Sequence, residues 1–228
     1  STYRFNTGDA FMQLAQQQSS STLFQSFTQF VSARECDEHR QRLEDTVKQG
    51  FLAAYNASLT SFMPLLCQYK TQQGHCTLGL RNATSPLFIE QYLAAPIEQF
   101  LPMGTQRSKV FELGNLYSTH RKATLSHFII VNEALRAIGA TNLVFCATKH
   151  VRALLRLLGV TCNEIALANS SVVEQPKSWG SYYANQPTVC IVNLEQAHLQ
   201  VLNTPMLLDI KQQNTHGITA LINALEAV

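Results

Sequence analysis

Glu112 is the residue of this chain whose setting best suits acid–base chemistry. It is a single carboxylate inside the apolar run Phe111-Glu112-Leu113. Burial disfavours the charged form of a carboxylate and raises its pKa, which would suit a general base near neutral pH. Two other interpretations stay open at this point: a strand carboxylate that faces solvent, or one that is paired with an Arg or a Lys.

A second candidate site follows the same predicted strand. The segment Ser118-Thr119-His120-Arg121-Lys122 connects it directly to a predicted helix, whose first backbone N–H groups lack helical partners. With Arg121 and Lys122 beside them, these groups could bind a phosphate. The alternative is a helix capped by Ser118 or Thr119, with two solvated basic side chains.

Aromatic residues form a third group. Tyr92, Trp179, Tyr182 and Tyr183 could line an acyl or substrate pocket, because such side chains combine an apolar body with a polar tip. They could equally anchor loops. Nearby, Glu90 and Glu98 flank Pro96 and are expected to be solvated.

Several other chemistries find no support in the residue patterns. His120, His127 and His150 lack the H-E-x-x-H spacing of a metal site, no C-x-x-C pair is present, and no G-x-S-x-G motif indicates a serine hydrolase. We therefore expect no metal.

Charge and hydropathy limit the partners. The net charge is +2 without a run of Lys or Arg, which argues against nucleic-acid binding. No apolar run reaches the roughly 18 residues that span a bilayer. The start of the sequence, Ser1-Thr2-Tyr3-Arg4-Phe5, lacks the features of a signal peptide. We expect a cytoplasmic protein, with secretion left open.

The elements before residue 105 are a helix and a hairpin. Apolar positions predict a helix from Arg34 to Ala57, and two apolar runs around Gly74 predict an antiparallel hairpin. Pro64 should place its strand at an edge or a bulge. Cys67 and Cys76 flank this hairpin, as a disulfide or as two reduced thiols. Residues 87–100 read as two short helical pieces separated by Pro96.

The second half alternates strands and helices, which favours a mixed α/β sheet. Residues 1–33, rich in Gln and Ser, read as an N-terminal appendage, and residues 34–228 as a single domain. The expected elements are strands at 110–116, 143–147, 164–168 and 188–194, and helices at 121–138 (closed by Gly139), 150–158 (closed by Gly159) and 217–227.

The block from Val110 to Val160 resembles the cofactor-binding half of GNAT acyltransferases. It has a strand with Glu112-Leu113-Gly114-Asn115-Leu116, then a helix, a strand and a helix ending Leu154-Leu155-Arg156-Leu157-Leu158-Gly159. The resemblance implies a mixed, mostly antiparallel sheet, flanked by helices and splayed at the strand of Glu112. Lys122, Ala123 and Thr124 depart from the family's glycine-rich loop, and Leu155 stands where a tyrosine often serves as general acid.

Longer strings are similar to the bacterial thermostable hemolysin family. They are Leu78-Gly79-Leu80-Arg81-Asn82-Ala83, then Leu87-Phe88-Ile89-Glu90-Gln91-Tyr92-Leu93-Ala94-Ala95-Pro96-Ile97-Glu98-Gln99, the Glu112–Leu116 string, and Trp179-Gly180-Ser181-Tyr182-Tyr183. This similarity implies a GNAT-like fold akin to that of autoinducer synthases, and a link to lysis of red cells.

Two functions follow from the resemblance. The first is an acyltransferase that takes its acyl group from acyl-CoA or acyl carrier protein and gives it to a small molecule or lipid. Glu112 and Asn115 would be catalytic, and Tyr92, Trp179 and Tyr183 would form the substrate pocket. Residues in contact with the donor would be Leu116, Ser118, Arg121, Lys122, Ala123 and Thr124. The second function is a non-catalytic hemolysin or toxin, which would act on a membrane surface through the aromatic stretch Phe24–Phe30.

Overall fold

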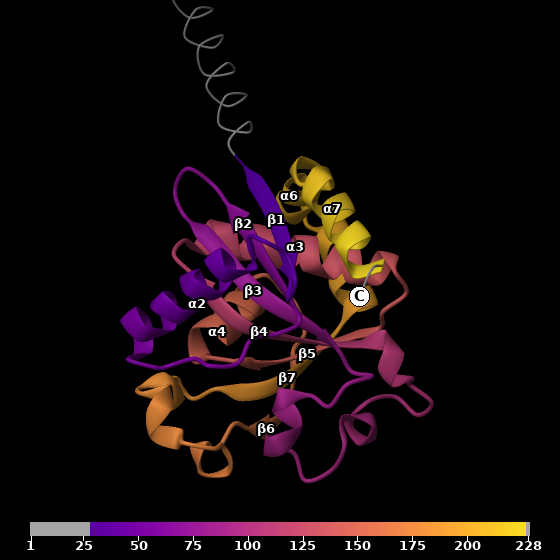
Figure 1. Cartoon of the computed structure of the whole chain (residues 1–228). Helices are drawn as coiled ribbons and strands as arrows, with labels where there is room; N and C mark the ends of the chain where they lie inside the picture. Colours follow the sequence, from indigo (N-terminus) through magenta and orange to yellow (C-terminus); the bar gives the residue numbers. More distant parts are fainter. Residues whose placement is uncertain (1–27, 227–228) are drawn as a thin grey trace, which may run out of the picture.

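The protein is built around one twisted sheet. A computed structural model describes residues 28–226 of the chain and shows a seven-stranded sheet in the order β1-β2-β3-β4-β5-β7-β6 (Figure 1). All neighbouring strands are antiparallel except β4 and β5, which are parallel. The strands are β1 (Gln29–Arg34), β2 (Leu65–Lys70), β3 (His75–Asn82), β4 (Val110–Ser118), β5 (Asn142–Ala147), β6 (Asn163–Leu167) and β7 (Thr188–Asn193).

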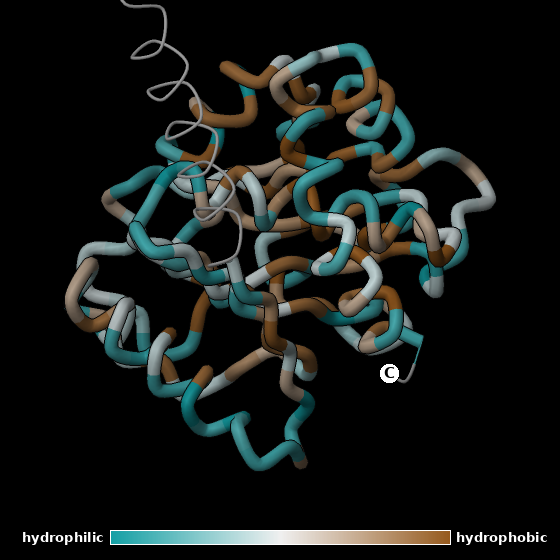
Figure 2. Tube along the Cα trace, turned by 90° about the horizontal axis from the view of Figure 1, so that it is seen from above, coloured by the Kyte–Doolittle hydropathy of each residue, from teal (hydrophilic) through white to brown (hydrophobic). Residues whose placement is uncertain are grey.

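Helices cover both faces of the sheet. One face carries α2 and the 3-10 helices η1 and η2; the other carries α3 to α7, of which α3, α6 and α7 lie together on the side away from α2 (Figure 1). Their bounds are α2 (Arg40–Tyr55), η1 (Phe88–Tyr92), η2 (Ile97–Phe100), α3 (Arg121–Ala137), α4 (Lys149–Leu157), α5 (Leu194–Asn203), α6 (Pro205–Gln213) and α7 (Thr215–Glu226). Hydrophilic residues lie mainly on the outer turns (Figure 2).

Strand β4 supplies side chains to both layers, because successive side chains of a strand point to opposite faces. Phe111 and Leu113 pack in the main core with Ile130 of α3. Val110 packs on the other face with Ile89 of η1. The alternation places Glu112 on the α2 face, beneath η1.

Strands β4 and β5 separate halfway along their length. They pair only from Val110 with Asn142 to Leu113 with Phe145. Beyond that point β4 continues to Ser118 beside β3, while β5 ends beside β7. The predicted splay at the strand of Glu112 is therefore confirmed, and with it the mixed, mostly antiparallel sheet.

The described part of the predicted N-terminal appendage is an edge strand. From Gln29 on, the chain pairs with β2, so the helix that was predicted from Arg34 begins only at Arg40. Phe30 packs against the main core, with its ring 5.7 Å from that of His127. Phe24 and the rest of residues 1–27 lie outside the described residues.

One expectation for the hairpin was wrong, and the two alternatives for its cysteines are decided. Its first strand, β2, is paired on both sides, so Pro64 neither marks an edge nor interrupts a ladder; it lies just before the strand. Cys67 and Cys76 are buried and free rather than disulfide-bonded. Helices α5 and α6 were not predicted. The two pieces around Pro96 do form, as short 3-10 helices.

Candidate active site

Glu112 is fully buried and held by two backbone hydrogen bonds and one ion pair. Its Oε2 atom accepts a 2.8 Å hydrogen bond from the backbone N–H of Ile89, and its Oε1 accepts one of 3.1 Å from Phe88. An Nη1 atom of Arg81, on the neighbouring strand β3, lies 3.7 Å from Oε1. Of the interpretations that the sequence left open, Glu112 is therefore both buried and paired with an arginine.

These contacts set the acidity of the carboxyl group. Burial raises the pKa of Glu112 to about 7, against the opposing effects of the N–H groups of Ile89 and Phe88 and of the Arg81 guanidinium. A carboxylate with such a pKa is partly ionised at neutral pH and can take up a proton there.

A second ion network fixes the η1 segment that clamps Glu112. Arg107 binds Glu90 at 2.7 Å and Glu98 at 3.0 Å, and Glu90 also accepts the N–H groups of Leu87 and Ile97. The Arg107 guanidinium holds the pKa of Glu90 at about 2. The expectation of a solvated carboxylate was therefore wrong for Glu90, whereas Glu98 is ion-paired but remains 39% exposed. No local pattern predicts the contact, because Arg107 lies seventeen residues after Glu90.

A cleft of about 770 Å³ opens on the α2 face where β4 and β5 diverge. Six of the residues predicted for the site lie along it: Glu112, Asn115, Leu116, Ser118, Thr124 and Trp179. Five do not: Tyr92, Tyr183, Arg121, Lys122 and Ala123. The cleft is large enough for a small-molecule ligand.

Asn115 shapes the cleft through its backbone and its amide. Asn115 has a φ of 51° and lies at a β-bulge. At this bulge, two residues of β4 stand opposite the single residue Leu78 of β3. The Oδ1 atom of Asn115 accepts the N–H of Met63 at 2.7 Å, and its Nδ2 donates to the carbonyl of Ser61 at 3.2 Å. The amide therefore fastens the segment after α2 over the cleft.

The start of α3 lies at the far end of the cleft. No side chain caps this helix at His120, and Thr124 donates its hydroxyl to that of Ser118 at 2.5 Å. Arg121 and Lys122 are exposed and form no ion pair among the described residues. The side chain of Ala123 points into the main core, so it leaves the helix start open.

An aromatic wall lines the cleft and begins beside Glu112. Trp179 and Tyr182 contact each other at 5.4 Å between ring centroids, and Trp179 contacts Phe88 at 5.8 Å. Gly180 makes the arrangement possible: its φ is 55°, and any Cβ there would collide with the carbonyl oxygen of Tyr55 at the end of α2.

Tyr92 and Tyr183 form a layer behind this wall. Their hydroxyl groups share a 2.7 Å hydrogen bond, and the ring of Tyr183 packs against that of Tyr182. The second layer fixes the first and has no contact with the cleft itself.

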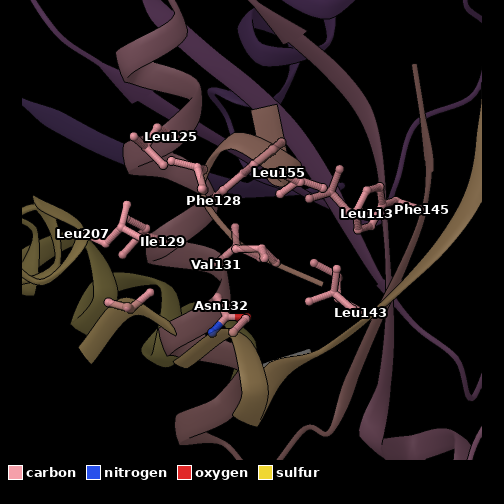
Figure 3. A pocket seen from close by; sticks show the side chains of 15 residues that line it. Leu113, Leu125, Phe128, Ile129, Val131, Asn132, Leu143, Phe145, Leu155 and Leu207 are labelled. Carbon is pink, nitrogen blue, oxygen red and sulfur yellow. The ribbon is translucent and has the colours of Figure 1, made fainter. Parts of the chain in front are cut away.

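An apolar cavity of about 60 Å³ lies on the other face, next to the splay. Figure 3 shows Leu113 and Phe145 at one end, and Ile129 and Leu207 at the other. Asn132 is the only polar residue among those described that line it. Leu155, at the position of the acid tyrosine, also lines it. Leu113 borders both this cavity and the cleft, so the two lie on either side of this residue, where β4 and β5 part.

Cys146 is the cysteine that lines the cleft. Burial raises the pKa of this thiol to about 12, so Cys146 stays protonated.

Among the described residues, no group of His, Cys, Asp and Glu is arranged to hold a metal ion. None of the described helices has the length and hydropathy needed to cross a bilayer.

Comparison with known proteins identifies a family and several structures with a similar fold. A family model described as "Thermostable hemolysin" matches residues 33–198. No curated protein matches the sequence. The crystal structure of TofI, in a ternary complex with an inhibitor and MTA, is similar over 79% of this chain and 99% of its own, at 15% identity and a TM-score of 0.53.

Two more solved structures share the fold. FeeM, an N-acyl amino acid synthase from uncultured soil microbes, is similar over 79% of this chain and 98% of its own, at 13% identity and a TM-score of 0.52. The AHL synthase LasI is similar over 73% and 90%, at 11% identity and a TM-score of 0.50. At such identities the likeness establishes the fold.

Proposed function

The chain belongs to the thermostable hemolysin family, and from this premise we propose that it transfers an acyl group from a pantetheine thioester to a small-molecule amine. The observation that carries the proposal is the splay beyond Leu113. At this point Leu113 lines both the cleft that holds a buried carboxylate and the apolar cavity on the other face. The names of FeeM and LasI, both synthases with this fold, agree with the proposal.

The donor would enter from the α3 end of the cleft. Beyond Leu113, the edge of β4 that faces β5 has no strand partner among the described residues, so its backbone groups are free to bind the amides of a pantetheine arm. Ser118 and Leu116 would lie along the arm. Arg121 and Lys122 at the helix start would bind the phosphate that both CoA and a carrier protein attach to pantetheine.

The acyl chain would pass between the splayed strands into the apolar cavity. Protein interiors contain few voids, and an empty cavity of this size costs about 1 kcal/mol of stability. A cavity lined by apolar side chains and reached from a polar cleft is suited to a hydrocarbon chain. At about 60 Å³ it would take the first methylene groups, and longer chains would require the lining side chains to move.

The chemistry assigned to Glu112 is that of a general base. The amine nitrogen attacks the thioester carbonyl carbon, the C–N bond forms and the C–S bond breaks. Glu112 takes a proton from the nitrogen, directly or through one water, and passes it to the pantetheine sulfur, which leaves as the thiol. Free N–H groups on β4 would stabilise the oxyanion. Cys146 stays protonated, which favours direct transfer over an acyl-cysteine intermediate.

Thiol release provides the direct test. The purified chain would be incubated with acetyl-, octanoyl- and palmitoyl-CoA, and with the matching acyl carrier proteins, in the presence of a mixture of amines. Calorimetric titration with CoA would measure donor binding separately. We expect thiol release that depends on the amines, a large loss in Glu112→Gln, and weaker donor binding in Arg121→Ala.

Matched variants control for general damage. Glu35→Gln and Arg156→Ala change exposed residues of the same types away from the cleft, and should behave as wild type. If no donor binds and no thiol is released by the wild-type chain, the proposed function is wrong.

An acylated amine would also explain the family name. A long-chain N-acyl product is amphiphilic and can disrupt membranes as a detergent does. Dye release from liposomes should then require donor, amine and enzyme together. Equal leakage by the Glu112→Gln variant would instead favour direct action of the protein on membranes.

A further inference from the structure

Arg81 is a cation without a full set of partners. Among the described residues that line the cleft it is the only Arg or Lys. Its side chain is 24% exposed, and its ion pair with Glu112, at 3.7 Å, is too long for a hydrogen bond. A guanidinium has five N–H donors, so Arg81 can bind a carboxylate from the cleft side.

Arg81 and Glu112 together present two opposite charges next to each other. An α-amino acid carries its amino and carboxylate groups on one carbon atom, a few ångströms apart, which matches the 3.7 Å between Arg81 and Glu112. An amine placed at Glu112 would therefore place its own carboxylate within reach of Arg81. An amine without a carboxylate would leave Arg81 with Glu112 as its only ion-pair partner among the described residues.

The aromatic wall begins beside Arg81 and Glu112. Phe88 donates its backbone N–H to the Glu112 oxygen atom that Arg81 also approaches, and its ring contacts Trp179. Trp179 in turn contacts Tyr182, and both line the cleft. A side chain on the α-carbon of a bound amino acid would meet this wall, where an aromatic or bulky apolar group gains most by burial.

We propose that the acyl acceptor is an α-amino acid with an aromatic or bulky apolar side chain, whose carboxylate is bound by Arg81. This inference rests on the acyl-transfer function proposed above and narrows its acceptor. The acceptor enters as a zwitterion, and its ammonium group loses two protons as the amide forms. One proton ends on the pantetheine thiol, and the other leaves through Glu112 to solvent. The products are an N-acyl amino acid and free thiol.

A panel of three amines tests the assignment. Octanoyl-CoA and the purified chain would be combined with L-phenylalanine, glycine or phenethylamine, and the products measured by mass spectrometry. We expect kcat/KM for L-phenylalanine to exceed that for phenethylamine by about 10- to 100-fold, because the latter lacks only the carboxylate. Glycine, which lacks only the ring, should also react more slowly.

Variants of Arg81 link the selectivity to the residue. Arg81→Gln should bring the ratio of L-phenylalanine to phenethylamine close to one, and Arg81→Lys should keep part of it. The ratio is the measure, because loss of Arg81 also changes the charge beside Glu112 and so alters both rates together. Arg156→Gln, the same change at an exposed position, should leave the ratio unaffected.

The outcomes separate this inference from the proposed function. If phenethylamine reacts as well as L-phenylalanine, or if Arg81→Gln keeps the ratio, the acceptor assignment is wrong while acyl transfer stands. If no amine reacts, acyl transfer itself is wrong. Calorimetric titration of L-phenylalanine then decides the remaining point: binding that requires Arg81 supports an amino-acid site, and its absence overturns it.

Discussion

The two faces of the sheet differ in chemistry although they share strands β4 and β5. The α2 face holds the cleft, with Glu112, Arg81 and the aromatic wall. The α3 face holds a smaller cavity lined by apolar side chains and by Asn132. Successive side chains of β4 point to opposite faces. The side chain of Glu112 lies on the α2 face, and that of Leu113 lies on the α3 face.

This difference indicates that the two faces would have separate roles in an acyl transfer. Groups that move protons or bind charge lie on one side, and groups that accept a hydrocarbon lie on the other. The two spaces lie next to each other at Leu113, where β4 and β5 part. Changes on one face should therefore alter the chemistry or the acceptor, and changes on the other should alter the acyl chain.

The largest effect is expected from removing the base on the cleft face. Glu112→Gln keeps one acceptor oxygen for the N–H of Phe88 or of Ile89, places its amide NH2 against the other, and cannot take a proton. Turnover with an amine should fall by about 100- to 10,000-fold, while donor binding is retained. Steady-state kinetics with octanoyl-CoA, together with calorimetry, would check this. Retained turnover would remove Glu112 from the chemistry.

The wild-type rate should also depend on pH through this group. Because the pKa of Glu112 is raised to about 7, its ionised fraction, and with it kcat/KM, should rise through neutral pH. A profile that is flat between pH 6 and 8 would contradict the assignment of this carboxylate as the base.

The same substitution should change stability in the opposite direction. The unfolded chain releases the Glu112 proton near pH 4.5, whereas the folded chain holds it to about pH 7. Between these values the unfolded state binds fewer protons, so this group makes stability fall as pH rises, by roughly 3 kcal/mol in all. The stability of Glu112→Gln relative to wild type should therefore be higher at pH 8 than at pH 5 by up to that amount, on top of a pH-independent cost for the backbone N–H that the amide cannot accept.

The measurement must be a difference between variant and wild type. Burial lowers the pKa of His127 to about 4, which makes stability rise with pH in a window that overlaps that of Glu112. Urea unfolding of both proteins at pH 5 and pH 8 cancels the His127 contribution. A gap that stays constant with pH would show that Glu112 is not protonated in the folded state.

The sequence predicts the order of elements better than it predicts the site. The helix ending at Gly139 and the strand carrying Glu112 follow from local periodicity and could be placed to within a few residues. The clamp on Glu112 could not, because it is made by backbone N–H groups of Phe88 and Ile89, which any residue type supplies.

The roles of paired side chains were equally hidden. Arg81 and Glu112 meet only through the register of β3 and β4, and no spacing in the sequence encodes that register. Nothing in the sequence distinguishes Tyr92 and Tyr183 from Trp179 as pocket residues, although these two tyrosines form the layer behind it. Local patterns give elements, whereas contacts between distant segments decide which side chain reaches the cleft.

A change on the α3 face should affect only the acyl chain. Val201→Leu adds one methylene group to the lining of the apolar cavity, which should raise stability by up to about 1 kcal/mol. It should lower kcat/KM for palmitoyl-CoA by roughly 10-fold and leave acetyl-CoA and the choice of amine unchanged. An altered preference between L-phenylalanine and phenethylamine would break the division between the faces.

The smallest effect is expected from the hydroxyl pair behind the aromatic wall. Tyr183→Phe removes one partner of the 2.7 Å hydrogen bond to Tyr92 and should lower stability by about 1 kcal/mol, measured by urea unfolding. Because neither ring reaches the cleft, KM for the amine should stay within about twofold of wild type. The double variant Tyr92→Phe/Tyr183→Phe should cost less than the sum of the two single changes, since it leaves no unpaired hydroxyl. A large rise in KM for Tyr183→Phe alone would instead place this layer in the acceptor pocket and extend the reactive face beyond the wall formed by Trp179 and Tyr182.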